Sequence, residues 1–507
     1  MTYLIGVDIG TSATKAVLID ETGNIKAQAS AGYPMYEPAN GWAEQDPLDW
    51  KKAVLSAVKK IVEASKVNKE DVAGIGLTGQ MHGLVMLDES CQPMGRSIIW
   101  CDQRSGRQAQ KMKEMMSLEK WLDITSNPPL AGWTAAKIMW VRENRPEVYA
   151  KCKKILLPKD YIRYVLTGAF ATDVSDATGM QLLDVKNRCW SDTVLELLNI
   201  PRELLGNVYE SQEVTGTLLP EIAEELGLSE NTVVVAGASD NAAAAIGTGV
   251  VREGQAFTTI GTSAVVYSHL DHYAAVPEGG LHLCCCAVPG CYHTMGGPQS
   301  AGLSLEWFKE KFCQDFILQA LKEGRNIHEV INQMTKEIPI GSDKLIFLPF
   351  LLGERTPHME PDYRGAFVGL SNIHSQGHLL RAIMEGVAYC LADCNNILKE
   401  LGVSITDMRV CGGGSRSPVW QKILADLYRC DIHTMQQEEG PAYGAAILAG
   451  VGAGAFSDIP SACDRFIKED KTIQWNETEA AKYRQYHQIY DRIYEHLKTD
   501  FSALAKT

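Results

Sequence analysis

An α/β fold built from two similar domains is predicted by three features of this sequence. The pentapeptide Ile-Gly-Thr-Ser-Ala occurs twice, at 9–13 and 260–264, each time between two runs of strand-forming residues. The chain has 507 residues, which is too long for one compact core. Strand and helix patterns alternate along both halves, as in proteins whose sheets are covered by helices. We therefore expect two domains, at residues 1–247 and 248–507.

Composition narrows the classes of partner. The net charge of −14 argues against nucleic acid or an anionic membrane surface. No apolar stretch of about 18 residues runs without charge, and no basic start precedes a short apolar run, so neither a membrane span nor a signal peptide is expected. The 14 cysteines then fit a reducing compartment better than a disulfide framework. We expect a cytoplasmic protein.

The first half predicts a hairpin followed by alternating helices and strands. The hairpin covers about 3–30, with a turn at 22–24. Asp46-Pro47 reads as the cap and first turn of an amphipathic helix. The other elements expected before the domain boundary are strands at 72–77, 84–87 and 233–236, with helical patterns between them, and a helix at 242–249 that joins the halves.

The second half repeats this order, beginning with the second hairpin around 260–264. Helices are expected near 303–312 and 379–400, and strands at 345–348 and 408–411. A turn of three glycines, 412–414, follows the last of these strands and precedes another helix. Residues 475–507 have the pattern of a polar, amphipathic closing helix.

The two repeated turns are candidate phosphate sites. A turn of Gly, Thr and Ser leaves backbone N–H groups and hydroxyls free to surround an anion. One copy alone would favour an ordinary hairpin turn, but two copies in two halves favour a polyphosphate held from opposite sides. The sequence has no Gly-Lys dipeptide, so a Walker A loop is excluded.

Two carboxylates lie where strands meet these candidate sites. Asp8 stands two residues before the first turn, and because it would repel phosphates we interpret it as a partner of Mg²⁺. The alternative is a strand aspartate that faces solvent. Asp240 follows an apolar strand, at the end of a sheet where ligands usually bind, and could accept the proton of an attacking hydroxyl. Its alternative role is a helix cap.

Three further segments are weaker candidates. Met81-His82, between glycines, reads as a turn that faces a substrate. Gly412–Gly414 would allow the backbone close to an adenine ring or a ribose. The run Cys284–Cys286, with Cys291, His282 and His293 nearby, invites a zinc site, but adjacent strand residues point to opposite faces and no C-x-x-C spacing is present. Small buried side chains are the preferred interpretation there.

Taken in order, several motifs resemble those of the FGGY carbohydrate kinases over nearly the whole chain. They include Asp8-Ile9-Gly10-Thr11-Ser12, Gly79-Gln80-Met81-His82-Gly83, Ser239-Asp240-Asn241-Ala242-Ala243 and Gly412-Gly413-Gly414. The resemblance implies two actin-like, ribonuclease-H-like domains with an interdomain cleft. It also implies that ATP and Mg²⁺ bind mainly to the second domain and an open-chain sugar mainly to the first.

The resemblance assigns roles to individual residues. Asp240 would be the catalytic base and Asp8 the metal-associated carboxylate. The remaining assignments are Met81, His82, Trp133, Asp240 and Asn241 for the sugar, and Thr11, Ser12, Thr262, Gly302, Gly413 and Ser417 for the nucleotide.

Within this resemblance, the Gln-Met-His-Gly stretch favours the members that phosphorylate D-xylulose at the C5 hydroxyl with ATP over those that act on glycerol or gluconate. D-ribulose or another pentulose, an actin-like ATPase without a sugar, and a catalytically silent sugar-binding regulator are the alternatives. A homodimer is common in the family, but nothing in the sequence reports on an interface.

Overall fold

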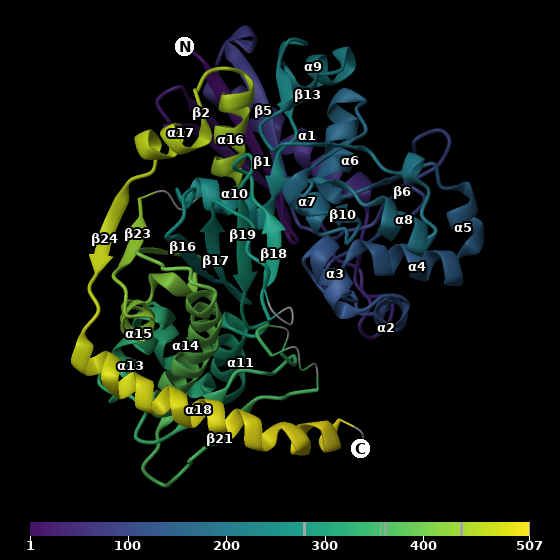
Figure 1. Cartoon of the computed structure of the whole chain (residues 1–507). Coiled ribbons are helices and arrows are strands. Elements are labelled where there is room, and N and C mark those ends of the chain that lie inside the picture. The colour runs from purple at the N-terminus through teal and green to yellow at the C-terminus, as the bar shows by residue number, and fades with distance from the viewer. Residues whose placement is uncertain (277–279, 355, 359, 361, 437–439, 506–507) are drawn as a thin grey trace.

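Two mixed sheets, each covered by helices, form the framework of the molecule (Figure 1). This computed structural model describes residues 1–276, 280–354, 356–358, 360, 362–436 and 440–505. The first sheet has the order β13-β14-β5-β1-β2-β3, with β15 added beside β5. Its strands are β1 (Tyr3–Ile9), β2 (Ala13–Asp20), β3 (Ile25–Gly32), β5 (Val72–Gly79), β13 (Val214–Thr217), β14 (Val233–Val235) and β15 (Ala238–Ser239).

The second sheet has the order β18-β19-β17-β16-β22-β23-β24. Its strands are β16 (Gln255–Ile260), β17 (Ala264–Leu270), β18 (His282–Cys285), β19 (Tyr292–Gly296), β22 (Asp407–Cys411), β23 (Ile432–Met435) and β24 (Glu469–Ile473). Apart from the added β18, the second sheet repeats the pairing of the first. An antiparallel hairpin (β1–β2, β16–β17) lies beside two parallel strands (β5 and β14, β22 and β23) and a final antiparallel strand (β13, β24).

Helices and small strands of the first half pack around the first sheet. Asp46 caps α1 (Pro47–Ser65) by accepting a hydrogen bond from Leu48 N, as the Asp-Pro pair predicts. The other helices are α2 (Gly106–Met115), α3 (Leu118–Thr125), α4 (Thr134–Asn144), α5 (Pro146–Lys151), α6 (Pro158–Thr167), α7 (Val174–Thr178), α8 (Asp192–Leu198), α9 (Pro220–Leu226) and α10 (Asp240–Gly247). The small strands are β4 (Glu44–Gln45), β6 (Val85–Leu87), β7 (Ser97–Ile98), β8 (Lys154–Leu156), β9 (Ala171–Asp173), β10 (Leu183–Asp184), β11 (Cys189–Trp190) and β12 (Asn207–Tyr209).

The second half contains α11 (Gly302–Phe312), α12 (Gln314–Lys322), α13 (Ile327–Lys336), α14 (Gln376–Glu400), α15 (Pro418–Tyr428), α16 (Gly440–Gly452), α17 (Ile459–Phe466) and α18 (Glu477–Leu504), with a small sheet of β20 (Ile346–Leu348) and β21 (Ala366–Val368). The expected hairpins and strands are confirmed. The joining helix begins at Asp240 rather than Ala242, and the closing helix ends at Leu504.

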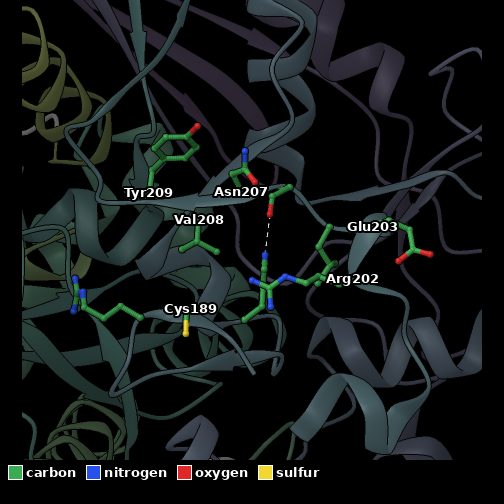
Figure 2. Close-up of a pocket in the computed structure, with 10 residues that line it drawn as sticks. Cys189, Arg202, Glu203, Asn207, Val208 and Tyr209 are labelled. Carbon is green, nitrogen blue, oxygen red and sulfur yellow. Dashed lines mark hydrogen bonds between the residues drawn. The ribbon is translucent and has the colours of Figure 1, made fainter. Parts of the chain in front are cut away.

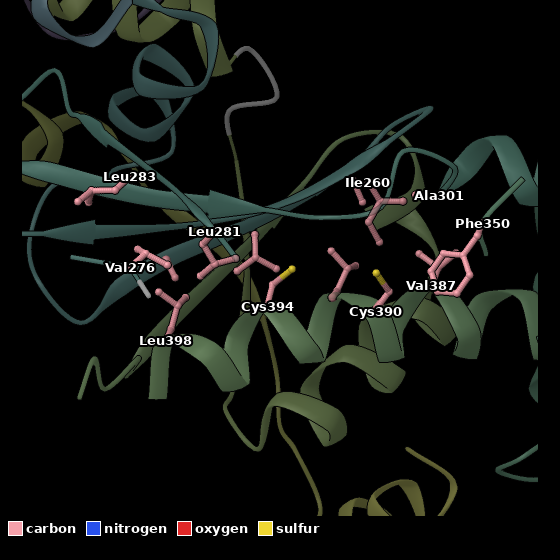
Figure 3. Close-up of a cluster of buried hydrophobic side chains, with 14 of the residues drawn as sticks. Ile260, Val276, Leu281, Leu283, Ala301, Phe350, Val387, Cys390, Cys394 and Leu398 are labelled. Atoms are coloured by element: carbon pink, nitrogen blue, oxygen red, sulfur yellow. The ribbon is translucent and has the colours of Figure 1, made fainter. Parts of the chain in front are cut away.

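The core of the second domain forms between its sheet and the apolar face of α14. Val387, Cys390, Cys394 and Leu398 recur along that helix and are buried, and they pack toward strand residues such as Ile260 (Figure 3). Burial of this helical stripe fixes α14 on the sheet.

Helix α16 belongs to the second half of the sequence but covers the first sheet (Figure 1). A Cβ atom at Gly6 would overlap the carbonyl oxygen of Ala442, and one at Gly76 would overlap that of Ala445. Glycines in β1 and β5 therefore let the helix backbone approach the strands. The division at residues 247 and 248 stays a prediction, and this packing ties the chain's later part to the earlier sheet. Within the described residues, every helix is too short or too polar to span a bilayer.

Candidate active site

One edge of the first sheet collects the predicted sugar and metal residues. Strands β1, β5 and β15 run parallel, with Ile9 opposite Gly79 and Gly79 opposite Ser239. Their carboxyl ends therefore lie together, which brings the Gly-Thr-Ser turn, the Met81-His82 loop and Asp240 to the same edge. Ligands bind at such strand ends in open α/β sheets.

Asp240 is the first residue of α10 and is half-buried. Its Oδ1 accepts hydrogen bonds from the backbone N and the Nδ2 of Asn241, at 2.7 and 2.9 Å. Burial nevertheless raises the pKa of Asp240 to about 6. Ser239, not Asp240, occupies the cap position. The carboxylate is thus oriented by Asn241 and has a pKa suited to accepting a proton near neutral pH.

A fully buried charged cluster supports the junction of β15 and α10. Ser175 Oγ donates to Asp173 at 2.5 Å and accepts from Ser239 N at 3.0 Å. Lys159 Nζ lies 3.0 Å from Asp173 and 3.5 Å from Asp176. Burial raises the pKa of Asp176 well above its usual value, and the charge of Asp240 adds to that shift. Sequence reasoning missed this cluster because its members come from separate elements.

Asp8 is half-buried between Val7 and Ile9, which are both fully buried, as their apolar character predicts. It lies opposite Lys15 in the β1–β2 ladder. Burial raises the pKa of Tyr33, and the charge of Asp8 adds to the shift. One carboxylate beside phosphates and water is a ligand set that Mg²⁺ accepts, so the residues present fit this ion.

The first turn continues from Asp8. The hydroxyl of Thr11 accepts a hydrogen bond from Trp100 Nε1 at 3.0 Å, and the carbonyl of Thr11 accepts one from Gln45 Nε2 at 2.6 Å. Ser12 is exposed. Thr11 is therefore held in place by neighbouring loops, while Ser12 presents its hydroxyl at the surface of the turn.

Three rings lie next to one another at the Met81-His82 loop. His82 stacks on buried Trp133 with ring centroids 4.8 Å apart, and His282 lies 5.6 Å from the same indole. His82 Nδ1 is 2.8 Å from the carbonyl oxygen of Gly179, which fixes the ring. His282 comes from β18 of the second sheet. The sequence drew attention to His282 only as a neighbour of the cysteine run, and nothing in it pointed to a contact with Trp133.

Two further contacts hold this loop. Lys137 Nζ donates to the carbonyl oxygens of His82 and Gly132, at 2.8 and 2.7 Å, and burial lowers the pKa of Lys137 to about 7. Met81 packs with Cys284 and Met295 of the second sheet. Edge strand β18 and its neighbour β19 thus contact the predicted sugar loop.

The second repeated turn lies against the start of α11. Thr262 is exposed, and its carbonyl accepts hydrogen bonds from Ala301 N and Leu303 N, both at 3.0 Å. A Cβ at Gly302 would overlap the carbonyl oxygen of Gly261, so the helix N-terminus can lie on the turn only with glycine there. Thr262 and Gly302 are brought together as predicted.

The glycine turn after β22 lies at the same edge as Thr262, because β16 and β22 are parallel with Thr259 opposite Cys411. Gly412 has a φ of +85°, which a side chain would strain. Gly413 is exposed, and a Cβ on it would meet no atom within 4 Å. This open backbone is where a flat ring could approach.

The hydroxyl of Ser417 already makes hydrogen bonds within the protein. Its hydroxyl donates to Asn332 Oδ1 at 2.5 Å and accepts from Trp420 N, which makes Ser417 the N-cap of α15. A contact of this hydroxyl with nucleotide stays a prediction.

Helix α10 connects the two edges. Asp240 begins it, and Ala245, about one turn later, packs with Phe257 and Tyr267 of the second hairpin. Val265 and Cys411, which adjoin the Thr262 and Gly412 turns, border the same cluster. The helix that begins with the catalytic candidate therefore packs against the strands that carry the predicted nucleotide turns.

A separate cavity of about 680 Å³ lies between β11, β12 and the loop before β12 (Figure 2). Cys189, Arg202, Glu203, Asn207 and Tyr209 are among its lining residues. None of the predicted site residues lines it, so it is distinct from the candidate active site.

Two sheets of the same pairing, each ending in a Gly-Thr-Ser turn with a carboxylate between them, define an actin-like phosphotransferase. The chain belongs to the FGGY family of carbohydrate kinases, since sequence models of the family's N-terminal and C-terminal domains match residues 3–247 and 256–453. It is an ATP-dependent sugar kinase, and the predicted two-domain actin-like fold is confirmed.

Xylulose kinases are among its relatives. The Bacillus subtilis xylulose kinase is 36% identical over 99% of both chains, and the Escherichia coli enzyme is 34% identical over 97% of this chain and 99% of its own. The crystal structure of ligand-bound xylulose kinase from Lactobacillus acidophilus has a TM-score of 0.92 at 27% identity and covers 99% of this chain and 100% of that one. A gluconokinase of Bacillus subtilis is 31% identical over 91% of this chain and 90% of its own.

Proposed function

We propose that this kinase transfers the γ-phosphoryl group of ATP to the C5 hydroxyl of D-xylulose, giving D-xylulose 5-phosphate and ADP. The observation that carries the proposal is the position of Asp240, a half-buried carboxylate with a raised pKa, at the same sheet edge as the Met81-His82 loop and on a helix that packs against the second hairpin. Xylulose kinases that align over nearly the whole chain support the choice of sugar.

Asp240 removes the proton of the C5 hydroxyl as that oxygen bonds to the γ-phosphorus and the bond to the β-phosphate oxygen breaks. Phosphoryl transfer asks little covalent work of side chains, so alignment and charge neutralisation dominate. Asn241 orients the carboxylate through its two hydrogen bonds to Oδ1. Asp8 is the residue that would hold Mg²⁺, which would offset the negative charge of the phosphates.

The sugar lies against the ring stack in this proposal. His82, fixed through Gly179 and stacked on Trp133, is the imidazole proposed to contact the sugar. The turns at Thr11-Ser12 and at Thr262, with Gly302 and Gly413, surround the triphosphate and the nucleoside.

A panel of acceptors tests the choice of sugar. ADP release is measured with D-xylulose, D-ribulose, D-gluconate and no sugar, at saturating ATP and Mg²⁺. We expect the highest kcat/KM with D-xylulose and little turnover without sugar. A clear preference for D-ribulose or D-gluconate would overturn the substrate, and sugar-independent turnover would favour the actin-like ATPase alternative.

The base assignment is tested by Asp240→Asn, which keeps the shape of the side chain and removes its basicity. We expect kcat to fall about 10³-fold, within the range that general-base catalysis contributes, while ATP binding measured by calorimetry persists. The sugar panel and this variant can fail separately, since one concerns the acceptor and the other the proton. Near-normal turnover in Asp240→Asn would refute the base.

A further inference from the structure

Three strands of the second sheet bring four metal-binding side chains together at one end. His269 is the last residue but one of β17, which ends at Leu270, and Asp271 follows the strand. Cys286 and Cys291 flank the turn between β18 and β19. In the ladders His269 lies opposite His293, and Cys285 lies opposite Tyr292. Residues two apart share a face, so His269, Asp271, Cys286 and Cys291 all project to the same side.

The contacts confirm this convergence. One ligand atom each from His269, Asp271 and Cys291 lies within 4.8 Å of the other two. His269 Nε2 is 3.1 Å from Asp271 Oδ1, and the backbone N of Cys286 donates to the carbonyl of Cys291 at 3.1 Å. The ligand atoms of His269, Asp271 and Cys291 thus converge on one point, and Cys286 reaches it through a side-chain hydrogen bond to Cys291.

Polar and charged groups surround the two thiols. Cys286 and His269 both make side-chain hydrogen bonds with Cys291. Arg188 donates to the carbonyl oxygen of Cys291 at 3.0 Å, and its charge acts on Cys286. A nearby guanidinium would partly balance a site that contains two thiolates and a carboxylate. His269 and Cys286 are each only 1% exposed, while Asp271 opens the cluster to solvent.

The mixture of donors selects the ion. Two sulfurs, an imidazole and a single carboxylate form a tetrahedral set of the kind that Zn²⁺ prefers, whereas Mg²⁺ and Ca²⁺ require oxygen ligands. We propose that His269, Asp271 and Cys291 bind Zn²⁺, with Cys286 as the fourth ligand. With four protein ligands the site is closed, so its role is structural rather than catalytic.

The objection from adjacent thiols does not apply to this set. Cys284, Cys285 and Cys286 cannot all face one ion, but only Cys286 of the three takes part. Its partner Cys291 lies just before the facing strand β19, and the other two ligands lie near the end of β17 and just after it. A sequence search for C-x-x-C cannot find this site, because strand pairing creates it.

The site would stabilise a functional part of the fold. Further along the same strands, His282 lies against Trp133, and Cys284 packs on Met81. Zn²⁺ bound at this end of the sheet would cross-link β17, β18 and β19. It would thereby stabilise the strands that contact the sugar loop. Zn²⁺ is expected to bind without nucleotide or sugar, which separates this proposal from the kinase reaction.

The experiment uses the untagged full-length protein, freed of metal with a chelator and dialysed against Zn²⁺. We expect one Zn²⁺ per chain by elemental analysis, a raised Tm, and a thiolate-to-metal charge-transfer band when Co²⁺ replaces Zn²⁺. Cys291→Ser should weaken Zn²⁺ binding by more than the ~100-fold that loss of an outer-shell partner costs. Cys189→Ser, at an exposed thiol outside the cluster, is the matched control and should bind as the wild type does.

A second measurement covers the case in which Cys291→Ser fails to fold. Alkylation of the wild-type protein is followed by mass spectrometry, with and without Zn²⁺. Zn²⁺ should protect Cys291 and Cys286 and leave labelling of Cys189 unchanged. Substoichiometric Zn²⁺ in the wild type, equal labelling with and without the ion, or unaltered Zn²⁺ binding in Cys291→Ser would overturn the site.

Discussion

The two repeated hairpins have the same backbone and different chemistry. Asp8-Ile9-Gly10-Thr11-Ser12 in the first corresponds to Thr259-Ile260-Gly261-Thr262-Ser263 in the second, so a neutral threonine stands where the first domain has a carboxylate. The strand beside each hairpin differs as well. After β5 come Gln80, Met81 and His82, whereas after β22 come only glycines. The first edge offers charge and side chains, and the second offers open backbone.

This difference shows how two domains of the same fold can take different roles in one reaction. The edge with side chains suits recognition of hydroxyls and the proton transfer. The edge without them suits close approach of the backbone to a triphosphate and a flat ring. Helix α10 joins the two edges and carries Asp240 at its first residue.

The largest expected difference in kcat comes from the one position at which the two hairpins differ in charge, Asp8 in the first and Thr259 in the second. Asp8→Asn removes one charge and should lower kcat about 100-fold, the scale of losing one electrostatic contact to a developing charge. Thr259→Val changes the corresponding residue of the second hairpin and should leave kcat close to the wild-type value. Steady-state kinetics over a range of Mg²⁺ concentrations measures both. Equal losses in the two variants would contradict the division of roles.

A second comparison concerns glycines in the two edges. Gly6→Ala places a methyl group against the backbone of α16 and should lower the free energy of unfolding by about 3 kcal/mol. Gly413→Ala meets no atom and keeps a helical φ of −61°, so it should not destabilise the fold. Denaturant unfolding measures both free energies.

Gly413→Ala should instead raise the KM for ATP, because its methyl group would occupy the surface that the ring approaches. Normal ATP kinetics in this variant would place the nucleoside elsewhere. Normal stability in Gly6→Ala would show that α16 does not pack on β1 as described.

Much of this architecture was predictable from sequence, because local patterns set it. The repeated pentapeptide predicted both hairpins, Asp46-Pro47 predicted the start of α1, and strand ends predicted the positions of Asp8 and Asp240. Short apolar runs bounded by glycine gave the parallel strands.

What could not be predicted depends on distant packing. Helix α16 returns to the first sheet, and His282 reaches Trp133 from the other domain. The buried cluster around Lys159 and Asp176 likewise joins separate elements. At Ser417 the sequence predicted a contact with nucleotide and did not predict the role seen in the structure, where its side chain caps α15.

The dependence of kcat/KM on pH tests most directly whether Asp240 acts as an ionised base between the two edges. Burial raises its pKa to about 6, so the carboxyl is protonated and inactive below that value and ionised above it. We expect kcat/KM for D-xylulose to be level above about pH 7 and to fall tenfold per unit below about pH 6. A profile that stays flat down to pH 5 in a protein that remains folded would contradict the account.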